Sequence, residues 1–236
     1  MHENYFNRDG SELLPFVPAR RDRVLEINCG EGLLSGYLSG TQEVWGTEPS
    51  LAVGMARKRL THVFQGTFDQ TKASLPLAHF DLIICNDGLS RMPDHAGFLR
   101  DIRNFLLPGG MLIGSVANVR HYQTMFQYVL ERDWCYRGSG TLNRAYFSFF
   151  TERSLRRAFK LAGFTVIQLK GVKTGTLGGN LRQQVYYGLA CLLSALTFGY
   201  FSDILPLQFA FQAVPAAPAP AVDTGLQDQT FAGSSR

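Results

Sequence analysis

The sequence predicts an α/β fold in which helices cover both faces of a mainly parallel β-sheet. Strand-like apolar runs alternate with helical patterns along most of the chain, as in βαβ units. Residues 80–85 form an almost continuous apolar run, which is typical of a central strand buried on both faces. The first predicted strand, residues 24–27, leads into a turn containing Gly30 and Gly32, the arrangement with which α/β proteins bring backbone N–H groups to a nucleotide-like ligand.

The composition fits one α/β domain with extra segments. The chain has 236 residues, of which 45% are hydrophobic and 18% charged, so there is enough apolar material for a full core. The net charge of +4 comes from scattered basic residues, and we therefore expect no nucleic-acid partner. The amino terminus lacks the apolar core of a signal peptide, which predicts a cytoplasmic protein.

The four cysteines lie far apart and show no metal-binding spacing with the five histidines. Two of them fall at the ends of predicted buried strands. We therefore expect free thiols in a reducing compartment, and no metal site.

The amino-terminal part of the chain contains three predicted elements. Residues 1–22 are expected to form a lead-in helix and loop, because Pro15 and Pro18 end any helix there. The apolar residues 24–27 form the first strand. Residues 32–39 are expected to form the helix whose N-terminus faces the ligand.

The next segments continue the alternation. Residues 43–47 are a strand that ends at Glu48, residues 51–60 a helix, and residues 61–65 a weakly marked third strand. The buried strand 80–85 follows. Its carboxyl end carries polar residues, which is where open α/β sheets place their chemistry. These are Asn86 and Asp87.

The carboxyl-terminal part of the sheet is predicted in the same way. A helix begins at Asp94 with apolar residues at helical period, and residues 108–110 end it before a strand at 111–116. Thr151 caps a later helix that Gly163 ends. The other expected elements are a helix at 122–132, a loop to 150, and strands at 164–172 and 205–214.

Residues 183–202 contain no charged side chain. We expect a helical lid or core insertion at about 178–203. The alternatives are a segment that contacts a membrane surface and a segment that spans a membrane. Residues 214–236 are Ala/Pro-rich and then polar, which predicts a disordered tail or linker. The predicted domain therefore spans residues 23–213.

Two acidic residues end neighbouring strands beside the glycine turn. Glu26 lies where a carboxylate meets a cationic ligand group, and Glu48 lies where a carboxylate accepts both hydroxyls of a ribose. Gly30 and Gly32 let the main chain approach the ligand closely. An ordinary strand-to-helix turn is the alternative interpretation of the glycines.

Further motifs follow the glycine turn in a fixed order. Together they resemble the class I S-adenosylmethionine-dependent methyltransferases, and more narrowly a bacterial group often found near glycan and O-antigen biosynthesis functions. The resemblance covers roughly residues 5–213. The segments that carry it are 26–32, Glu48, 66–68, 80–83, 87–89, 107–110, 118–121, 149–151 and 162–164.

The resemblance implies a Rossmann-like, seven-stranded, mostly parallel sheet with helices on both faces and a last antiparallel strand. It also implies S-adenosyl-L-methionine (SAM) as cofactor, which leaves as S-adenosyl-L-homocysteine. The residues expected to bind it are Glu26, Asn28, Gly30, Gly32, Glu48, Pro49, Thr67, Phe68 and Asn86.

The chain departs from the family pattern at several positions. Asn28 stands where the family usually has glycine, although Asn tolerates the left-handed backbone that such a turn needs. Thr67 replaces a usual Asp, so that the adenine amino group keeps only a neutral acceptor. Ser90, Arg91 and residues 145–148 replace segments in which the family often has histidine.

Methyl transfer to an alcohol requires a base, which is worth on the order of 10²–10⁴-fold. His121 follows the fifth strand and is the first candidate, with a structural histidine as the alternative. Asp87 is the second candidate, and its alternatives are orienting the cofactor or capping a helix. Tyr146 is expected either to position a hydroxyl or stack on a sugar, or to be a core aromatic.

The sequence therefore favours a methyltransferase that acts on oxygen in a small molecule or glycan. One alternative is N-methylation of an amino sugar or other amine, for which the missing histidines matter less. Another is a SAM-binding module without catalysis that serves as a partner or regulatory domain. A nicotinamide dehydrogenase is disfavoured, because residues 30–36 lack the dinucleotide glycine spacing.

Overall fold

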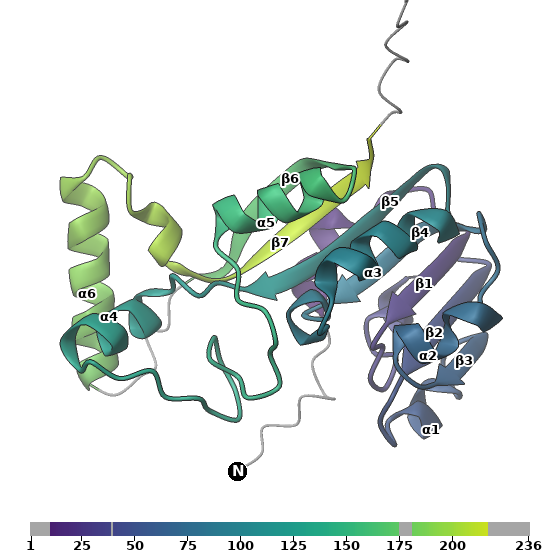
Figure 1. Ribbon diagram of the computed structural model, residues 1–236, viewed down its shortest axis with the longest axis horizontal. Coiled ribbons are helices and arrows are strands. Elements are labelled where there is room, and N and C mark those ends of the chain that lie inside the picture. The colour runs from purple at the N-terminus through teal and green to yellow at the C-terminus, as the bar shows by residue number, and fades with distance from the viewer. Residues whose placement is uncertain (1–9, 39, 175–180, 217–236) are drawn as a thin grey trace, which may run out of the picture.

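A computed structural model describes residues 10–38, 40–174 and 181–216 of the chain. Its strands form one seven-stranded sheet of order β3-β2-β1-β4-β5-β7-β6 (Figure 1). β1 to β5 pair in parallel, and β7 runs antiparallel to both β5 and β6. The strands are β1 (Arg23–Ile27), β2 (Glu43–Glu48), β3 (His62–Gln65), β4 (Phe80–Asn86), β5 (Leu106–Ala117), β6 (Phe164–Thr174) and β7 (Pro206–Pro215).

This arrangement confirms the predicted Rossmann-like, mostly parallel sheet with a last antiparallel strand. Helices lie on both sides of the sheet. The α-helices are α1 (Val53–Ala56), α2 (Phe68–Thr71), α3 (His95–Ile102), α4 (Tyr122–Leu130), α5 (Glu152–Leu161) and α6 (Leu181–Leu196). The 3₁₀ helices are η2 (Ser11–Phe16), η3 (Ser35–Tyr37), η4 (Lys72–Ser74), η5 (Leu89–Arg91), η6 (Arg103–Phe105) and η7 (Ser202–Ile204).

Alternate residues of the central strands feed two separate hydrophobic clusters, because successive side chains of a strand point to opposite faces. Leu25 and Ile83 join the cluster under α2, α3 and α5. Val24 and Leu82 join the cluster covered by η2, α1 and the residues that flank η3. The near-continuous apolar run of β4 is thus explained by burial on both faces, as predicted.

The predicted helix at residues 32–39 is wrong. Residues 32–38 form turns and a single 3₁₀ turn, η3, and residue 39 lies outside the described part. Gly30 and Gly32 have φ values of 57° and 72°, and these left-handed conformations prevent an α-helix from starting at the turn. The ligand-facing helix N-terminus is therefore absent, and the loop itself presents its backbone.

Three other elements differ in extent from the prediction. The helix expected at 51–60 is only the single α-turn of α1, followed by hydrogen-bonded turns. The lead-in helix is the 3₁₀ helix η2, which contains Pro15, and residues 1–9 lie outside the described part. β5 begins at Leu106, so the predicted turn at 108–110 lies inside the strand, next to a register shift against β4.

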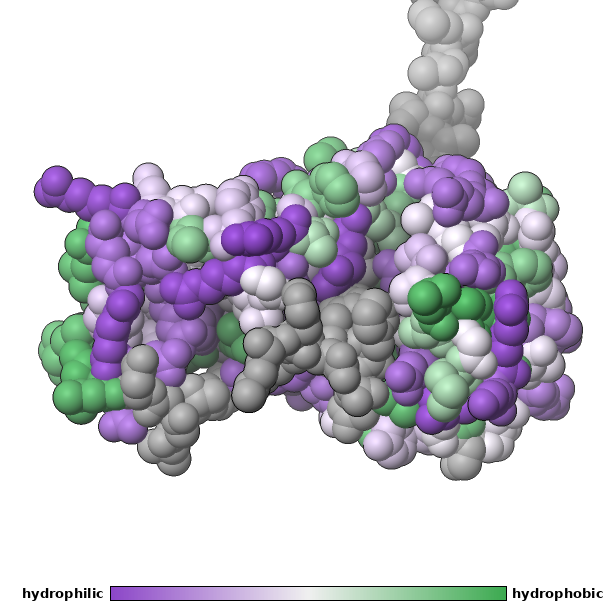
Figure 2. Space-filling view, turned by 90° about the horizontal axis from the view of Figure 1, so that it is seen from below, coloured by the Kyte–Doolittle hydropathy of each residue, from purple (hydrophilic) through white to green (hydrophobic). Residues whose placement is uncertain are grey.

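Residues 183–196 of the charge-free segment lie in α6, and the lid or core insertion expected at about 178–203 stays a prediction. α6 lies beside α4 beyond the end of the sheet, around a small apolar cluster that includes Tyr122, Ala190 and Ile204 (Figure 1). Figure 2 shows apolar side chains gathered at this end of the molecule. Within the described ranges, no helix combines the length and the apolar character needed to cross a bilayer.

β7 continues to Pro215, so the first two residues of the predicted tail belong to a strand. Residues 217–236, on which most of that prediction falls, lie outside the described residues. The domain limits of 23–213 stay a prediction.

Candidate active site

Two buried carboxylates lie at the carboxyl ends of β1 and β2. Glu26 is 4% exposed and accepts a hydrogen bond from the Ser35 hydroxyl. Glu48 is 2% exposed and accepts from the backbone N–H groups of Gly30 at 2.8 Å and Ser50 at 2.9 Å. Since β1 and β2 are neighbours in the sheet, the structure brings both acids and the glycine loop to one place.

Burial raises the pKa of Glu26 from 4.5 to about 7, because a charged carboxylate loses its hydration. The hydrogen bond from Ser35 opposes this shift, and the nearby charge of Glu48 adds to it. A cation bound next to Glu26 would favour the ionised carboxylate. The site is therefore suited to an ammonium group.

The loop between these acids has a left-handed backbone at Asn28, with φ of 55°. This confirms the expectation that Asn replaces glycine at a position that needs this conformation. The Cys29 N–H donates to the Thr47 carbonyl at 3.0 Å and so fastens the loop to β2. Burial raises the pKa of the Cys29 thiol far above its usual range, so this cysteine is not a thiolate nucleophile.

The carboxyl end of β4 holds the next polar group. The Asn86 side-chain oxygen accepts from the Ser115 hydroxyl at 2.6 Å, and the Asp87 N–H donates to the Ser115 carbonyl at 3.0 Å. Asp87 has φ of 54°, a strained conformation for a residue with a side chain. Such strain persists where surrounding contacts impose it, and it is common at functional sites.

Asp87 and Tyr146 form a buried pair. The Tyr146 hydroxyl lies 2.8 Å and 2.6 Å from the two carboxylate oxygens of Asp87, to which it donates. Arg91 places a guanidinium nitrogen 3.7 Å from the same carboxylate and lies over the Tyr146 ring at 5.4 Å from its centroid. The aspartate charge is therefore compensated inside the protein.

The segment after Tyr146 is bonded to the segment after Asp87. The N–H groups of Phe147 and Ser148 donate to the Ser90 carbonyl, at 2.9 Å and 3.2 Å. The Ser148 hydroxyl lies 2.9 Å from Nδ1 of His95, the first residue of α3. The chain thus brings a histidine to this edge that sequence reasoning missed.

Three serines were also missed, namely Ser35, Ser115 and Ser148. Serine is common in loops and carries little signal by itself. His95 could have been predicted from the sequence, because it begins the α-helix that follows the acidic motif after β4.

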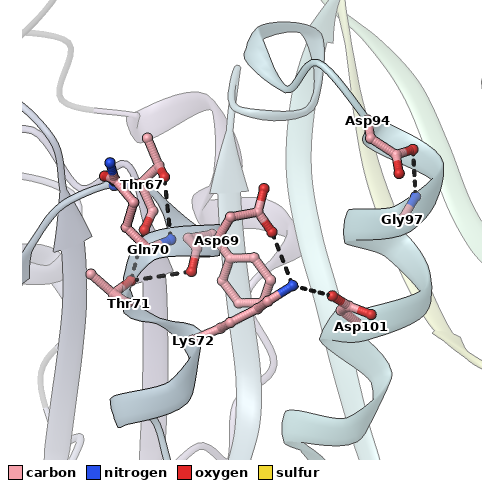
Figure 3. Close-up of polar contacts among 9 residues, drawn as sticks. Thr67, Asp69, Gln70, Thr71, Lys72, Asp94, Gly97 and Asp101 are labelled. Atoms are coloured by element: carbon pink, nitrogen blue, oxygen red, sulfur yellow. Dashed lines mark hydrogen bonds and ion pairs between the residues drawn. The ribbon is translucent and has the colours of Figure 1, made fainter.

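The predicted adenine segment lies at the start of α2. Thr67 accepts from the Gln70 N–H at 3.4 Å, and the Gln70 side chain accepts from the Thr67 N–H at 2.9 Å, which is a capping box (Figure 3). Phe68 is buried, with its ring 5.0 Å from that of Phe98. Contacts with a ligand would therefore come from the main chain or from Thr67. Pro49 is exposed directly after Glu48.

His121 is 4% exposed at the N-terminal end of α4, with its ring 4.3 Å from that of Tyr122. Burial lowers the pKa of His121 to about 4, so its imidazole is neutral at pH 7. Among the described residues, His121 Nδ1 has no hydrogen-bond partner. The hydrogen bonds that join Asp87, Tyr146 and His95 to their partners do not involve the His121 ring.

The fold and these residues can be compared with known proteins. A model of the methyltransferase domain family matches residues 1–169. The protein belongs to this family. It is a SAM-dependent methyltransferase of class I, and SAM is its cofactor.

Relatives with a named activity resemble the chain at low identity. The ubiquinone biosynthesis O-methyltransferase of Cereibacter sphaeroides is 26% identical over 174 residues, which cover 71% of this chain and 68% of the relative. The enzyme of the same name from Azoarcus sp. is 27% identical over 157 residues, which cover 64% and 67%.

Solved structures share the fold. A SAM-dependent methyltransferase from Archaeoglobus fulgidus matches with a TM-score of 0.62 at 13% identity, over 86% of this chain and 91% of that one. The [4+2]-cyclase SpnF matches with a TM-score of 0.52 at 19% identity, over 83% and 75%. At such identities the likeness concerns the fold alone.

The residues present fit SAM. Glu26 and Glu48 are buried acids at adjacent strand ends, and the loop between them carries three left-handed residues that bring its backbone close. A SAM molecule offers an ammonium group and two ribose hydroxyls as partners for two carboxylates. Within the described residues, no cluster of three or more His, Cys, Asp or Glu side chains is suited to a metal ion.

Proposed function

We propose that the protein transfers the methyl group of SAM to an oxygen of a small molecule or glycan. The buried Asp87–Tyr146 pair is the observation that carries this proposal, because it places a carboxylate and a phenol hydroxyl at the sheet edge that also bears Glu26 and Glu48. The relatives named O-methyltransferases support an oxygen acceptor. The grouping with glycan-associated enzymes stays a prediction.

The cofactor contacts are part of the proposal. Glu26 binds the ammonium group of the methionine part, and Glu48 binds the ribose hydroxyls. The backbone of residues 28–32 and the side chains of Thr67 and Asn86 line the rest of the cofactor site. When bound, SAM supplies a methyl group on a sulfonium, an electrophile that needs alignment with the acceptor in a dry site.

Asp87 and Tyr146 serve the acceptor. A phenol oxygen can donate one hydrogen bond and accept others. The acceptor hydroxyl donates its proton toward the Tyr146 oxygen, while Tyr146 donates its own proton to Asp87. Arg91, 3.7 Å from Asp87, keeps the pair electrically balanced. His121 remains the alternative base, because its imidazole is neutral and its Nδ1 has no hydrogen-bond partner among the residues that the structure describes.

The test uses labelled SAM with paired acceptors, catechol and its diamine analogue. We expect a methyl ether from catechol. Asp87→Asn and Tyr146→Phe should each lower kcat about 10²-fold and leave the Kd for SAM within about twofold, because a lost proton acceptor affects the chemical step. Asp69→Asn, which removes an exposed acid, is the control. His121→Ala in the same assay tests the alternative base.

Other outcomes would contradict this function. Methylation of the diamine alone would favour the N-methyltransferase. SAM binding without product across a broad acceptor panel would favour a module that has lost catalysis. Unchanged turnover in Asp87→Asn and Tyr146→Phe would remove this pair from the mechanism.

We also propose that the α4–α6 end touches a membrane surface. α6 exposes Leu181, Leu189, Leu192 and Leu196 on its outer side, and Phe198 beyond its end is fully exposed. Apolar faces of this kind insert into the headgroup region of bilayers. Co-sedimentation with lipid vesicles tests the proposal, with Leu192→Ser plus Leu196→Ser as the variant. Equal recovery of both proteins with the vesicles would contradict it.

A further inference from the structure

A groove of about 430 Å³ runs between α3 and α5. His95 and Ser148, which are hydrogen-bonded to each other, line one part of it. Arg100 from α3 and Arg157 from α5 line it from opposite sides. Phe149 and Leu161 are among the apolar residues that supply the rest of the surface. The groove therefore combines cations with an apolar floor.

The charge of this groove is entirely positive. No acidic residue lines it, and Arg100 and Arg157 are both exposed. In the part of the chain that the structure describes, neither arginine makes an ion pair or a side-chain hydrogen bond. Arg100 also borders a neighbouring hollow lined by Arg103. Basic side chains thus continue from α3 into η6.

The nearby acids have other partners. Asp101 of α3 binds Lys72 at 2.7 Å, on the side that faces α2, and Asp94 accepts from the Gly97 N–H at 2.8 Å (Figure 3). Glu152 of α5 pairs with Arg156 at 2.9 Å. The acid at the N-cap of α3 and the acid within α3 are thus engaged elsewhere, and among the described residues no acid pairs with Arg100 or Arg157.

The groove begins beside the candidate active site. Ser148 is two residues from Tyr146, whose hydroxyl binds Asp87. Arg100 lies five residues after His95 on α3, which corresponds to roughly 7.5 Å along the helix. Arg100 is in the last turn of α3, and Arg157 is the sixth residue of α5, so the two guanidinium groups supply the positive charge of the groove themselves.

We propose that this groove binds a phosphate group carried by the acceptor, between Arg100 and Arg157, with the apolar part of the acceptor on the groove floor. Guanidinium groups bind phosphate through paired, charge-assisted hydrogen bonds. The volume of about 430 Å³ lies in the range of small-molecule sites. This inference rests on the proposed function, since it names a class of substrate for the same site.

The test is a binding measurement that does not depend on methyl transfer. Phenyl phosphate and inorganic phosphate are titrated into the full-length protein at low salt and followed by calorimetry. The double variant Arg100→Gln plus Arg157→Gln is compared with Arg153→Gln plus Lys160→Gln. This control removes the same charge from exposed positions of α5 that do not line the groove. Circular dichroism and SAM affinity establish that both variants are folded.

We expect phenyl phosphate to bind wild type at least fivefold more tightly than inorganic phosphate, because the floor contacts the ring. The groove variant should lose at least tenfold in affinity for phenyl phosphate, and the control should stay within about twofold of wild type. Equal affinities for the two probes, equal losses in both variants, or no binding by wild type would each overturn the proposal. If the protein binds phenyl phosphate as expected but transfers no methyl group, the proposed function is contradicted and the phosphate site is not.

Discussion

At the scale of single residues, the site is built from buried charges that cost stability. Glu26 is buried, and its pKa is raised to about 7, so ionising it in the folded protein is unfavourable. A protein tolerates such a group where a ligand compensates it. The raised pKa is thus a physical reason to assign Glu26 to a cationic ligand group.

Replacing Glu26 tests whether its carboxylate lowers the stability of the free protein and strengthens the binding of SAM. The pKa of Glu26 in the folded protein lies above its unfolded value of 4.5. The protonated Glu26 carboxyl therefore makes its full contribution to stability below pH 4.5, and this contribution is lost as the pH rises through 7. Glu26→Gln should therefore raise the free energy of unfolding at pH 8 by up to about 3 kcal/mol without SAM. It should also weaken SAM binding at least tenfold, because a charge-assisted hydrogen bond is lost.

Urea unfolding and calorimetry measure the two effects. Glu152→Gln, an exposed acid on α5 with one ion pair, serves as the control and should change neither quantity much. A Glu26→Gln variant that binds SAM like wild type would remove Glu26 from the cofactor site.

His121 gives a prediction of opposite sign. Its folded pKa of about 4 lies below the unfolded value of 6.5, so stability is complete above pH 6.5 and is lost as the pH falls through 4. Between pH 7 and pH 4, wild type should lose up to about 3 kcal/mol that His121→Gln does not lose. Urea unfolding at the two pH values measures this. Parallel pH profiles would show that His121 is not buried as a neutral imidazole.

At the scale of elements, a capping box marks the start of α5. The Thr151 hydroxyl accepts from the Ser154 N–H at 3.1 Å, and the Ser154 hydroxyl accepts from the Thr151 N–H at 2.9 Å. This capping box begins α5 where the sequence predicted it. The 3₁₀ helix η3 has no side-chain cap, and Gly30 and Gly32 before it adopt left-handed conformations that do not continue into a helix.

The capping boxes that begin α2 and α5 should differ in how much they stabilise the protein. Thr151→Ala should cost about 1 kcal/mol, since α5 has ten residues and a well-formed cap. Thr67→Ala should cost less, because its cap distance is 3.4 Å and α2 has only four residues. Thermal unfolding measures both, and 1 kcal/mol corresponds to a shift of about 2–4 °C. A larger loss for Thr67→Ala would contradict this ranking.

At the scale of the whole molecule, the sheet order decides which residues meet. β1 lies between β2 and β4, so the ends of all three strands gather Glu26, Glu48 and Asn86 at one edge. The loop before α5 then returns to this edge, where Tyr146 meets Asp87 from 59 residues away along the chain. The α4–α6 pair extends beyond the sheet and leaves this edge free of its helices (Figure 1).

The sequence by itself determined the alternation of strands and helices, the helices with clear period, and the turn at Asn28, while the last antiparallel strand was implied only by the resemblance to the family. These features depend on local patterns, because apolar period, capping residues and backbone preference act over a few residues. The acidic strand ends could be predicted for the same reason, since they directly follow strong strand signals.

Only the tertiary structure decided the partners of these residues. It showed that Glu26 has a raised pKa, that Tyr146 donates to Asp87, and that His95 rather than His121 is bonded to the segment beside them. It also showed that Arg100 and Arg157 face one groove without acids. Burial and contacts between distant segments arise from packing, so no local pattern in the sequence encodes them.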